Sequence, residues 1–119
     1  MEKNKSIANK ADNGLFTIIT KALTSSKIPK INVADAAAQE SSYVFLDSRE
    51  KEEFDVSHIK DAIFTGASDF NYKGIQSLSK NTKIIVYCSV GVRSDQIAKK
   101  LIDAGYRDVQ NLFGGIFEW

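Results

Sequence analysis

The sequence contains 119 residues, of which 43% are hydrophobic and 26% charged, a balance that favours one folded domain and argues against wholesale disorder. Sixteen basic residues against fifteen acidic ones leave a net charge of +1, so we expect no nucleic-acid partner, because such binding usually needs a marked basic excess. One cysteine and one histidine exclude an intrachain disulfide, and they predict no metal site.

The first 28 residues are expected to form a polar arm and an amphipathic helix that precede the main domain. Residues 1–13 are polar and rich in Lys and Asn, which indicates a solvated, frayed arm. After Gly14 the apolar residues follow the spacing of one helical stripe: Leu15, Ile18, Ile19, Ala22 and Leu23. This stripe predicts a helix that covers part of the domain.

The chain is expected to be cytoplasmic and not to span a membrane. No apolar run approaches the roughly 20 residues that a membrane helix needs. The start of the chain also lacks the sustained apolar stretch of a secretory signal. A chain that starts at Met1 and carries a free, reactive thiol is therefore assigned to the cytoplasm.

Residues 29–119 alternate short apolar strands with helical segments, which is typical of an α/β domain with a central, mainly parallel sheet flanked by helices. We expect strands at residues 43–46, 63–64, 83–87 and 109–112, and short helices at residues 33–39, before Ile59 and around Leu78. The longest helix is expected at residues 95–104, with Ser94 as its N-cap and Gly105 as its stop. Phe117 and Trp119 are expected to close the core.

Cys88 directly follows the most convincing predicted strand, the β-branched run at residues 83–87, and precedes the longest predicted helix. Ligand sites form at this carboxyl edge of open α/β sheets. Gly91 allows a tight loop whose peptide N–H groups converge on the sulfur, and the helix N-terminus and Arg93 add positive charge. These effects stabilise a thiolate and predict a pKa below the ~8.5 of free cysteine. We therefore prefer a catalytic Cys88 to a buried, inert one.

Three segments resemble the rhodanese-like domains, a family of sulfurtransferases. YCSVGVRS (residues 87–94) is similar to the family's active-site loop, in which a strand delivers a nucleophilic cysteine. LDSREKEEFDVSHIKDA (46–62) resembles the pattern D-x-R, E-F and G-H-I-x-G-A, with Ser57 and Asp61 in place of the usual glycines, and Phe64 and Thr65 follow where Asn often stands. GYRDVQNLFGGIFEW (105–119) resembles the closing G-Y-x-x-V-x-x-L-x-G-G segment.

The resemblance implies a ping-pong transfer of sulfane sulfur through a Cys88 persulfide, without a cofactor. The donor would be thiosulfate or a persulfide, and the acceptor cyanide, a thiol or a protein. The loop residues are the expected substrate-binding set: Ser89, Val90, Gly91, Val92, Arg93 and Ser94. Four further residues are expected to give structural support: Asp47, Arg49, Glu53 and His58.

Spacing and charge predict the partners of the two arginines, Arg49 and Arg93. Arg49 and Glu53 are four residues apart and are expected to pair on one helical turn, while Asp47 ties down its own turn. Arg93 is the only basic side chain of the loop, so we expect it to face the donor and make thiosulfate a usable but mediocre substrate. The alternative is that Arg93 points outward and pairs with an acid such as Asp95.

Three other functions remain open on the sequence alone. A phosphatase or arsenate reductase would use a Cys-x5-Arg loop, whereas Cys88 and Arg93 enclose four residues, a loop in which phosphate should fit poorly. A non-catalytic interaction module on the same fold usually lacks the loop cysteine. A persulfide carrier that serves a partner protein would retain it.

Overall fold

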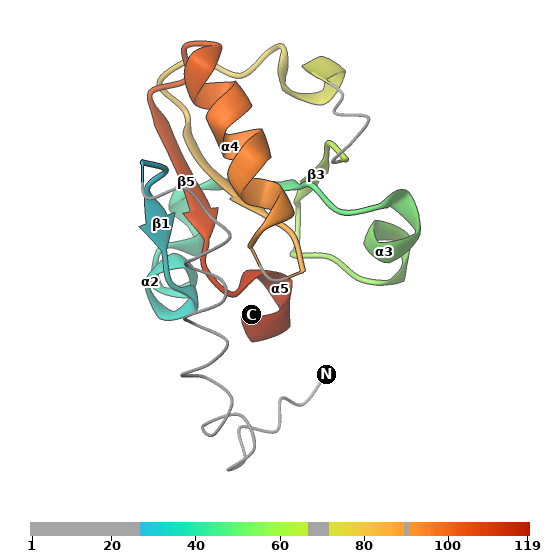
Figure 1. Ribbon diagram of the computed structural model, residues 1–119. Helices are drawn as coiled ribbons and strands as arrows, with labels where there is room; N and C mark the ends of the chain where they lie inside the picture. The colour runs from blue at the N-terminus through green and yellow to red at the C-terminus, as the bar shows by residue number, and fades with distance from the viewer. Residues whose placement is uncertain (1–26, 67–71, 90) are drawn as a thin grey trace.

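The computed structural model describes residues 27–66, 72–89 and 91–119. Most of the expected N-terminal arm and helix, and Val90 of the loop, lie outside these ranges. Within them, five strands form one parallel sheet in the order β1-β5-β4-β2-β3 (Figure 1). The strands are β1 (Lys30–Ile31), β2 (Val44–Asp47), β3 (Ile63–Phe64), β4 (Lys83–Tyr87) and β5 (Asp108–Leu112).

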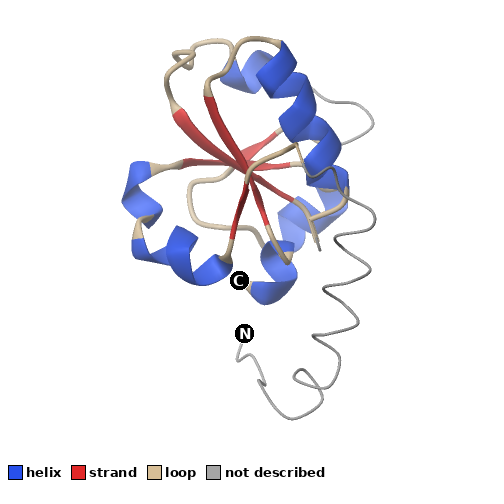
Figure 2. Ribbon diagram, turned by 60° about the vertical axis from the view of Figure 1, so that its left-hand side comes forward, coloured by secondary structure: helices blue, strands red, loops and turns tan. Residues whose placement is uncertain are grey.

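Helices lie on both faces of this sheet (Figure 2). They are α2 (Val33–Ala38), α3 (Lys51–Val56), α4 (Arg93–Asp103) and α5 (Gly115–Glu118), with 3-10 segments η1 (Glu40–Ser42) and η2 (Tyr72–Ile75). A parallel sheet covered on both faces confirms the expected α/β class. Across the three described ranges, none of the helices combines the length and apolar character that crossing a membrane requires.

Strand β4 anchors the fold because both of its faces are buried. Ile84 and Val86 pack in the cluster that also holds Ile97 and Leu101 of α4, while Ile85 packs with the cluster on the opposite face. This alternation is the period-two pattern of a strand. The carboxyl end of β4 is therefore held firmly beside that of β2, and the loop that follows starts from a fixed point.

Helix α4 begins at Arg93, two residues before the expected start, so the N-cap prediction for Ser94 is wrong. Val92 occupies the N-cap position, and Ser94 lies inside the first turn. The Ser94 hydroxyl hydrogen-bonds Asn111 and approaches Cys88. It is therefore engaged in tertiary contacts and does not cap the helix. At the other end, Gly105 has φ of +102° and stops the helix as expected.

Three other expectations differ from the structure. Leu78 lies beyond η2 and in no helix, although its side chain packs against the core. Trp119 packs edge-on against Phe45 with ring centroids 5.5 Å apart, whereas Phe117 is 62% exposed, so only Trp119 helps to close the core. Strand β1 and helix α5 were not expected, because elements of two and four residues are too short to show a periodic pattern.

Candidate active site

Cys88 lies at the carboxyl edge of the sheet with hydrogen-bond donors directed at its sulfur. Its Sγ accepts from the backbone N–H of Gly91 at 3.1 Å and from that of Ser94 at 3.4 Å, and Ser94 Oγ is 3.5 Å away. The Ser94 amide belongs to the first turn of α4, where N–H groups have no partner within the helix. The residue is only 1% exposed, so little water competes with these donors. Three hydrogen-bond donors thus surround the sulfur of the candidate nucleophile.

Asn111 of β5 hydrogen-bonds two residues of the Cys88 loop. Its Nδ2 donates to the carbonyl oxygen of Gly91 at 2.7 Å, and its Oδ1 accepts from Ser94 Oγ. Gly91 has φ of +102°, and a Cβ there would lie 3.2 Å from the carbonyl oxygen of Leu112. Asn111 was not among the residues expected at the site. No signal in the sequence pointed to it, because β5 reads Asp-Val-Gln-Asn-Leu and only the structure shows that Asn111 is 1% exposed and needs partners.

Helix α5 supports the backbone of the loop from below (Figure 1). The N–H of Ile116 donates to the carbonyl oxygen of Cys88 at 2.9 Å, and that of Phe117 to Ser89 at 3.0 Å. Gly115 permits this approach, because a Cβ at its φ of +59° would lie 2.3 Å from the Cys88 carbonyl oxygen. The sequence analysis did not predict this role for Gly115, the second glycine of the closing segment.

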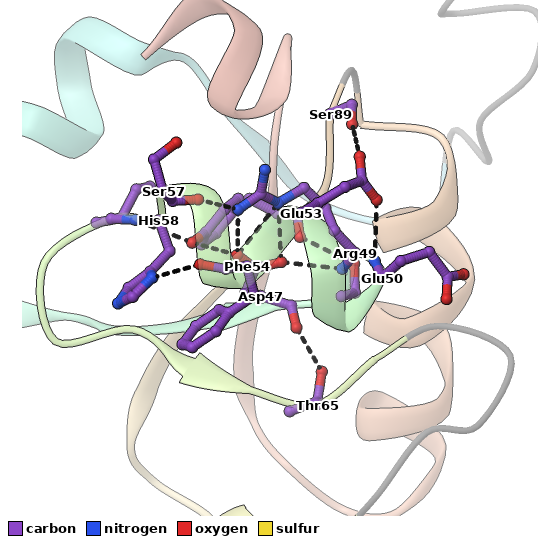
Figure 3. Close-up of polar contacts among 12 residues, drawn as sticks. Asp47, Arg49, Glu50, Glu53, Phe54, Ser57, His58, Thr65 and Ser89 are labelled. Atoms are coloured by element: carbon purple, nitrogen blue, oxygen red, sulfur yellow. Dashed lines mark hydrogen bonds and ion pairs between the residues drawn. The ribbon is translucent and has the colours of Figure 1, made fainter. Parts of the chain in front are cut away.

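Arg93 pairs with an acid, but with Glu53 of α3 and not with Asp95. Its Nη1 and Nη2 lie 3.3 and 3.5 Å from the two Glu53 oxygens, and Nη2 also donates to Ser89 Oγ at 3.0 Å. The Ser89 hydroxyl donates to Glu53 at 3.1 Å, and Figure 3 shows Glu53 reaching it. Asp95 instead lies 4.0 Å from Lys30 Nζ.

Glu53 and Arg93 each favour the charged form of the other. The pKa of Glu53 is lowered, first by the hydrogen bond from the Glu50 backbone N–H and then by Arg93, against the effect of burial. For Arg93, burial acts to lower the pKa, but hydrogen bonding and charge interaction with Glu53 and with Cys88 raise it overall. Both groups therefore stay charged across the neutral range.

The prediction that Arg49 pairs with Glu53 is wrong, because Arg49 forms its salt bridge with Asp47. Their salt bridge is 2.8 Å long, and Arg49 also donates to the carbonyl oxygen of Ser57 at 2.6 Å (Figure 3). Arg49 precedes the N-cap of α3, so the i, i+4 geometry of a helix does not apply to it. Asp47 accepts the Arg49 backbone N–H at 2.9 Å and so ties down its turn as expected.

The Asp47–Arg49 pair is fixed to β4 through Tyr87, the residue before Cys88. Tyr87 donates its hydroxyl to Asp47 at 2.7 Å and accepts the Ile59 N–H at 3.1 Å. Burial raises the pKa of Tyr87, so the phenol stays protonated as a donor. For Arg49, burial opposes the charge but the bonds to Asp47 raise its pKa overall. This buried network orients the segment that carries α3.

His58 lies two residues beyond the end of α3 and contacts Phe54 of that helix. Its Nδ1 lies 2.8 Å from the Phe54 carbonyl oxygen, which can only accept, and its ring stacks on that of Phe54 with centroids 3.8 Å apart (Figure 3). The ring is exposed to solvent. These contacts fix the position of the His58 ring.

Comparison with known proteins decides the family of this fold and loop. A family model for the rhodanese-like domain matches residues 31–119. The chain belongs to the rhodanese-like family. A rhodanese-related protein from Thermoplasma volcanium has the same fold, with a TM-score of 0.69 and 30% identity over 76% of this chain and 89% of that one. A human single-domain sulfurtransferase, 19% identical with a TM-score of 0.66 over 76% of this chain and 94% of its own, supports the fold alone.

A longer relative carries a different name. The tRNA uridine(34) hydroxylase of Aster yellows witches'-broom phytoplasma (strain AYWB) is 34% identical over 88 residues, which are 70% of this chain and 29% of that protein. The rhodanese-like chain described here therefore spans less than a third of that relative's length.

Two departures from the rhodanese-like pattern differ in their structural effect. Ser57 is extended, with φ of −167°, a conformation that any residue adopts. Asp61 has φ of +63°, the left-handed region that favours glycine. Asp61 thus adopts a backbone conformation that would suit the glycine of the family pattern.

Proposed function

We propose that this rhodanese-like domain is a sulfurtransferase that carries sulfane sulfur as a persulfide on Cys88. The observation that supports the proposal is the set of donors around Sγ, two backbone N–H groups and the Ser94 hydroxyl, at the start of an 11-residue helix. Fixed donors of this kind stabilise an anionic sulfur without a metal or cofactor. Cys88 is also the only thiol of the chain.

The proposed reaction has two half-reactions that balance without an oxidant or reductant. The Cys88 thiolate attacks the outer sulfur of thiosulfate, and a new S–S bond forms as the bond between the two donor sulfurs breaks. The electron pair of that bond leaves with sulfite. Cyanide or a thiolate then attacks the terminal sulfur of the persulfide, and the Cys88 thiolate departs as leaving group.

The roles proposed for the other residues follow from their contacts. The substrate-binding loop consists of Ser89, Val90, Gly91, Val92, Arg93 and Ser94. Gly91 and Ser94 donate to the sulfur, and Arg93 supplies the positive charge of the loop. Asn111 and Gly115 act as positioning residues, because they hold the loop backbone rather than contact the sulfur.

Replacing Cys88 by serine tests the proposal. The wild-type protein should gain the mass of one sulfur atom on exposure to thiosulfate and should form thiocyanate from cyanide. Cys88→Ser keeps the shape of the side chain and should abolish both signals while thermal unfolding remains cooperative. Thiocyanate formation above background by the serine variant would show that the proposed mechanism is wrong. One loading with sulfur but no continued turnover would instead favour a carrier that serves a protein acceptor.

The relative's name favours a second candidate, a role in the hydroxylation of tRNA uridine 34 as part of a longer protein. It is supported by the 34% identity to a protein of that name, over 29% of its length. The two candidates differ in their product. The test incubates tRNA with the chain under air, so that dioxygen is present as the oxidant. Hydroxylated uridine formed by wild type and not by Cys88→Ser would support the second candidate.

A further inference from the structure

Glu53 places a carboxylate against the Cys88 loop from a separate part of the chain. It comes from α3, yet it accepts from the Ser89 hydroxyl at 3.1 Å and lies 3.3 and 3.5 Å from the two terminal nitrogens of Arg93. Ser89 adjoins Cys88 in the chain, and Arg93 lies four residues beyond Ser89. The carboxylate thus contacts two residues of the loop that contains the reactive sulfur.

The side chains of this ion pair are accessible to a molecule in solvent, whereas the sulfur is buried. Glu53 and Arg93 are each 37% exposed at the side chain, and Cys88 is 1% exposed. A donor that approaches the loop from solvent therefore comes under the influence of these charges before it reaches the thiol. Since Arg93 is the only basic side chain of the loop, Glu53 offsets the charge that would attract an anion.

We propose that Glu53 determines the charge selectivity of the Cys88 site, so that sulfane donors of low charge are used in preference to the thiosulfate dianion. This inference rests on the proposed sulfurtransferase function and identifies the class of donor. The carboxylate neutralises Arg93 and repels a second negative charge. The energy of that repulsion scales with the charge of the donor, so a dianion is penalised about twice as strongly as a monoanion.

A structural role for Glu53 has to be separated from selectivity. Glu53 also accepts the backbone N–H of Glu50 at 2.9 Å and so completes the capping box of α3. Glutamine is the matched replacement, because its carbonyl oxygen can accept the same N–H and capping boxes use Gln as well as Glu. Loss of the cap alone would affect every donor equally, whereas loss of the charge would affect donors according to their own charge.

The test compares thiosulfate, a dianion, with methanethiosulfonate, a monoanion that gives up the same outer sulfur and releases methanesulfinate. Glu53→Gln should raise kcat/KM by about five- to tenfold for thiosulfate and by about two- to threefold for methanethiosulfonate. Both gains should shrink as ionic strength rises. The control is Glu52→Gln, which removes the same charge from the exposed neighbour and should change neither value by as much as twofold.

An equal effect on both donors, or the same change in Glu52→Gln, would overturn the inference. If wild type accepts sulfur from neither donor, the proposed function fails, and alkylation of Cys88 then decides the inference alone. The rate with iodoacetate, an anion, divided by that with neutral iodoacetamide should rise about two- to threefold in Glu53→Gln. Mass spectrometry reads this on the single thiol, and an unchanged ratio would overturn the inference.

Discussion

Replacing Gly115 by alanine should displace the Cys88 loop although the new methyl group touches no substrate. The added Cβ would lie 2.3 Å from the Cys88 carbonyl oxygen and 2.5 Å from that of Ser89. These are backbone atoms and cannot turn away as a flexible side chain would. To reach ordinary contact at 3.4 Å, the Cβ and the Cys88 oxygen must move apart by about 1.1 Å.

The expected cost has two sources that a second glycine separates. Alanine at φ of +59° is strained by about 1–2 kcal/mol. Displacement also weakens the two hydrogen bonds from Ile116 and Phe117 to the loop, each worth about 0.5–1.5 kcal/mol. Gly105 also has a positive φ, but its nearest neighbour would be a Lys80 carbon at 4.0 Å, so Gly105→Ala carries strain without the collision.

Urea unfolding and sulfur transfer measured on both variants provide the assay. Gly115→Ala should be less stable than wild type by about 2–5 kcal/mol, and Gly105→Ala by about 1–2 kcal/mol. Sulfur transfer per folded molecule should fall by about 100-fold in Gly115→Ala, because a shift of this size misplaces the thiolate. If Gly115→Ala keeps the stability and the transfer rate of Gly105→Ala, the supporting role assigned to α5 is refuted.

Four further results are expected. Arg93→Ala should raise KM for thiosulfate by about tenfold and Arg93→Lys by less, since an ammonium lacks the planar fork; an unchanged KM in steady-state kinetics excludes donor binding. Hydrolysis of an aryl phosphate should be undetectable, and turnover that depends on Cys88 would favour the phosphatase class. Asp61→Val should lower the free energy of unfolding by about 1–2 kcal/mol and Asp61→Gly by less; equal losses in urea would contradict the strain at φ of +63°. The pKa of Glu53 is lowered in the folded protein, so its carboxylate stabilises the fold above the pKa of the unfolded chain and loses this effect as pH falls through the folded pKa. The free energy of unfolding of Glu53→Gln should therefore differ from that of wild type by less than about 1 kcal/mol near pH 7, and the two should converge in acid. A difference that stays constant with pH would contradict this.

The parts of the site that lie close together in the sequence could be predicted. The β-branched run of β4 identified a buried strand, and its order before Gly91 and Arg93 placed Cys88 at the carboxyl edge of the sheet. The resemblance to the rhodanese-like family rested on the same local motifs and is confirmed. These features depend on neighbouring residues, which is why periodicity and turn chemistry could reveal them.

The parts that depend on distant partners could not be predicted. Ser94 has the chemistry of an N-cap, but Asn111, 17 residues later, takes its hydroxyl. Glu53 was expected to bind Arg49, four residues before it, yet it binds Arg93, 40 residues after it. In both cases local spacing offered a reasonable partner, and the packing of the sheet supplied a different one.

The strand order has a consequence for how the protein is made. Strand β5 lies between β1 and β4. Strand β1 therefore cannot join the other strands of the sheet until nearly the whole domain has been synthesised. Asn111 and Gly115, which hold the Cys88 loop in place, belong to or follow that same strand. A nascent chain on the ribosome therefore carries its thiol on an unfinished loop, and we expect the proposed sulfur transfer to begin only after β5 has joined the sheet.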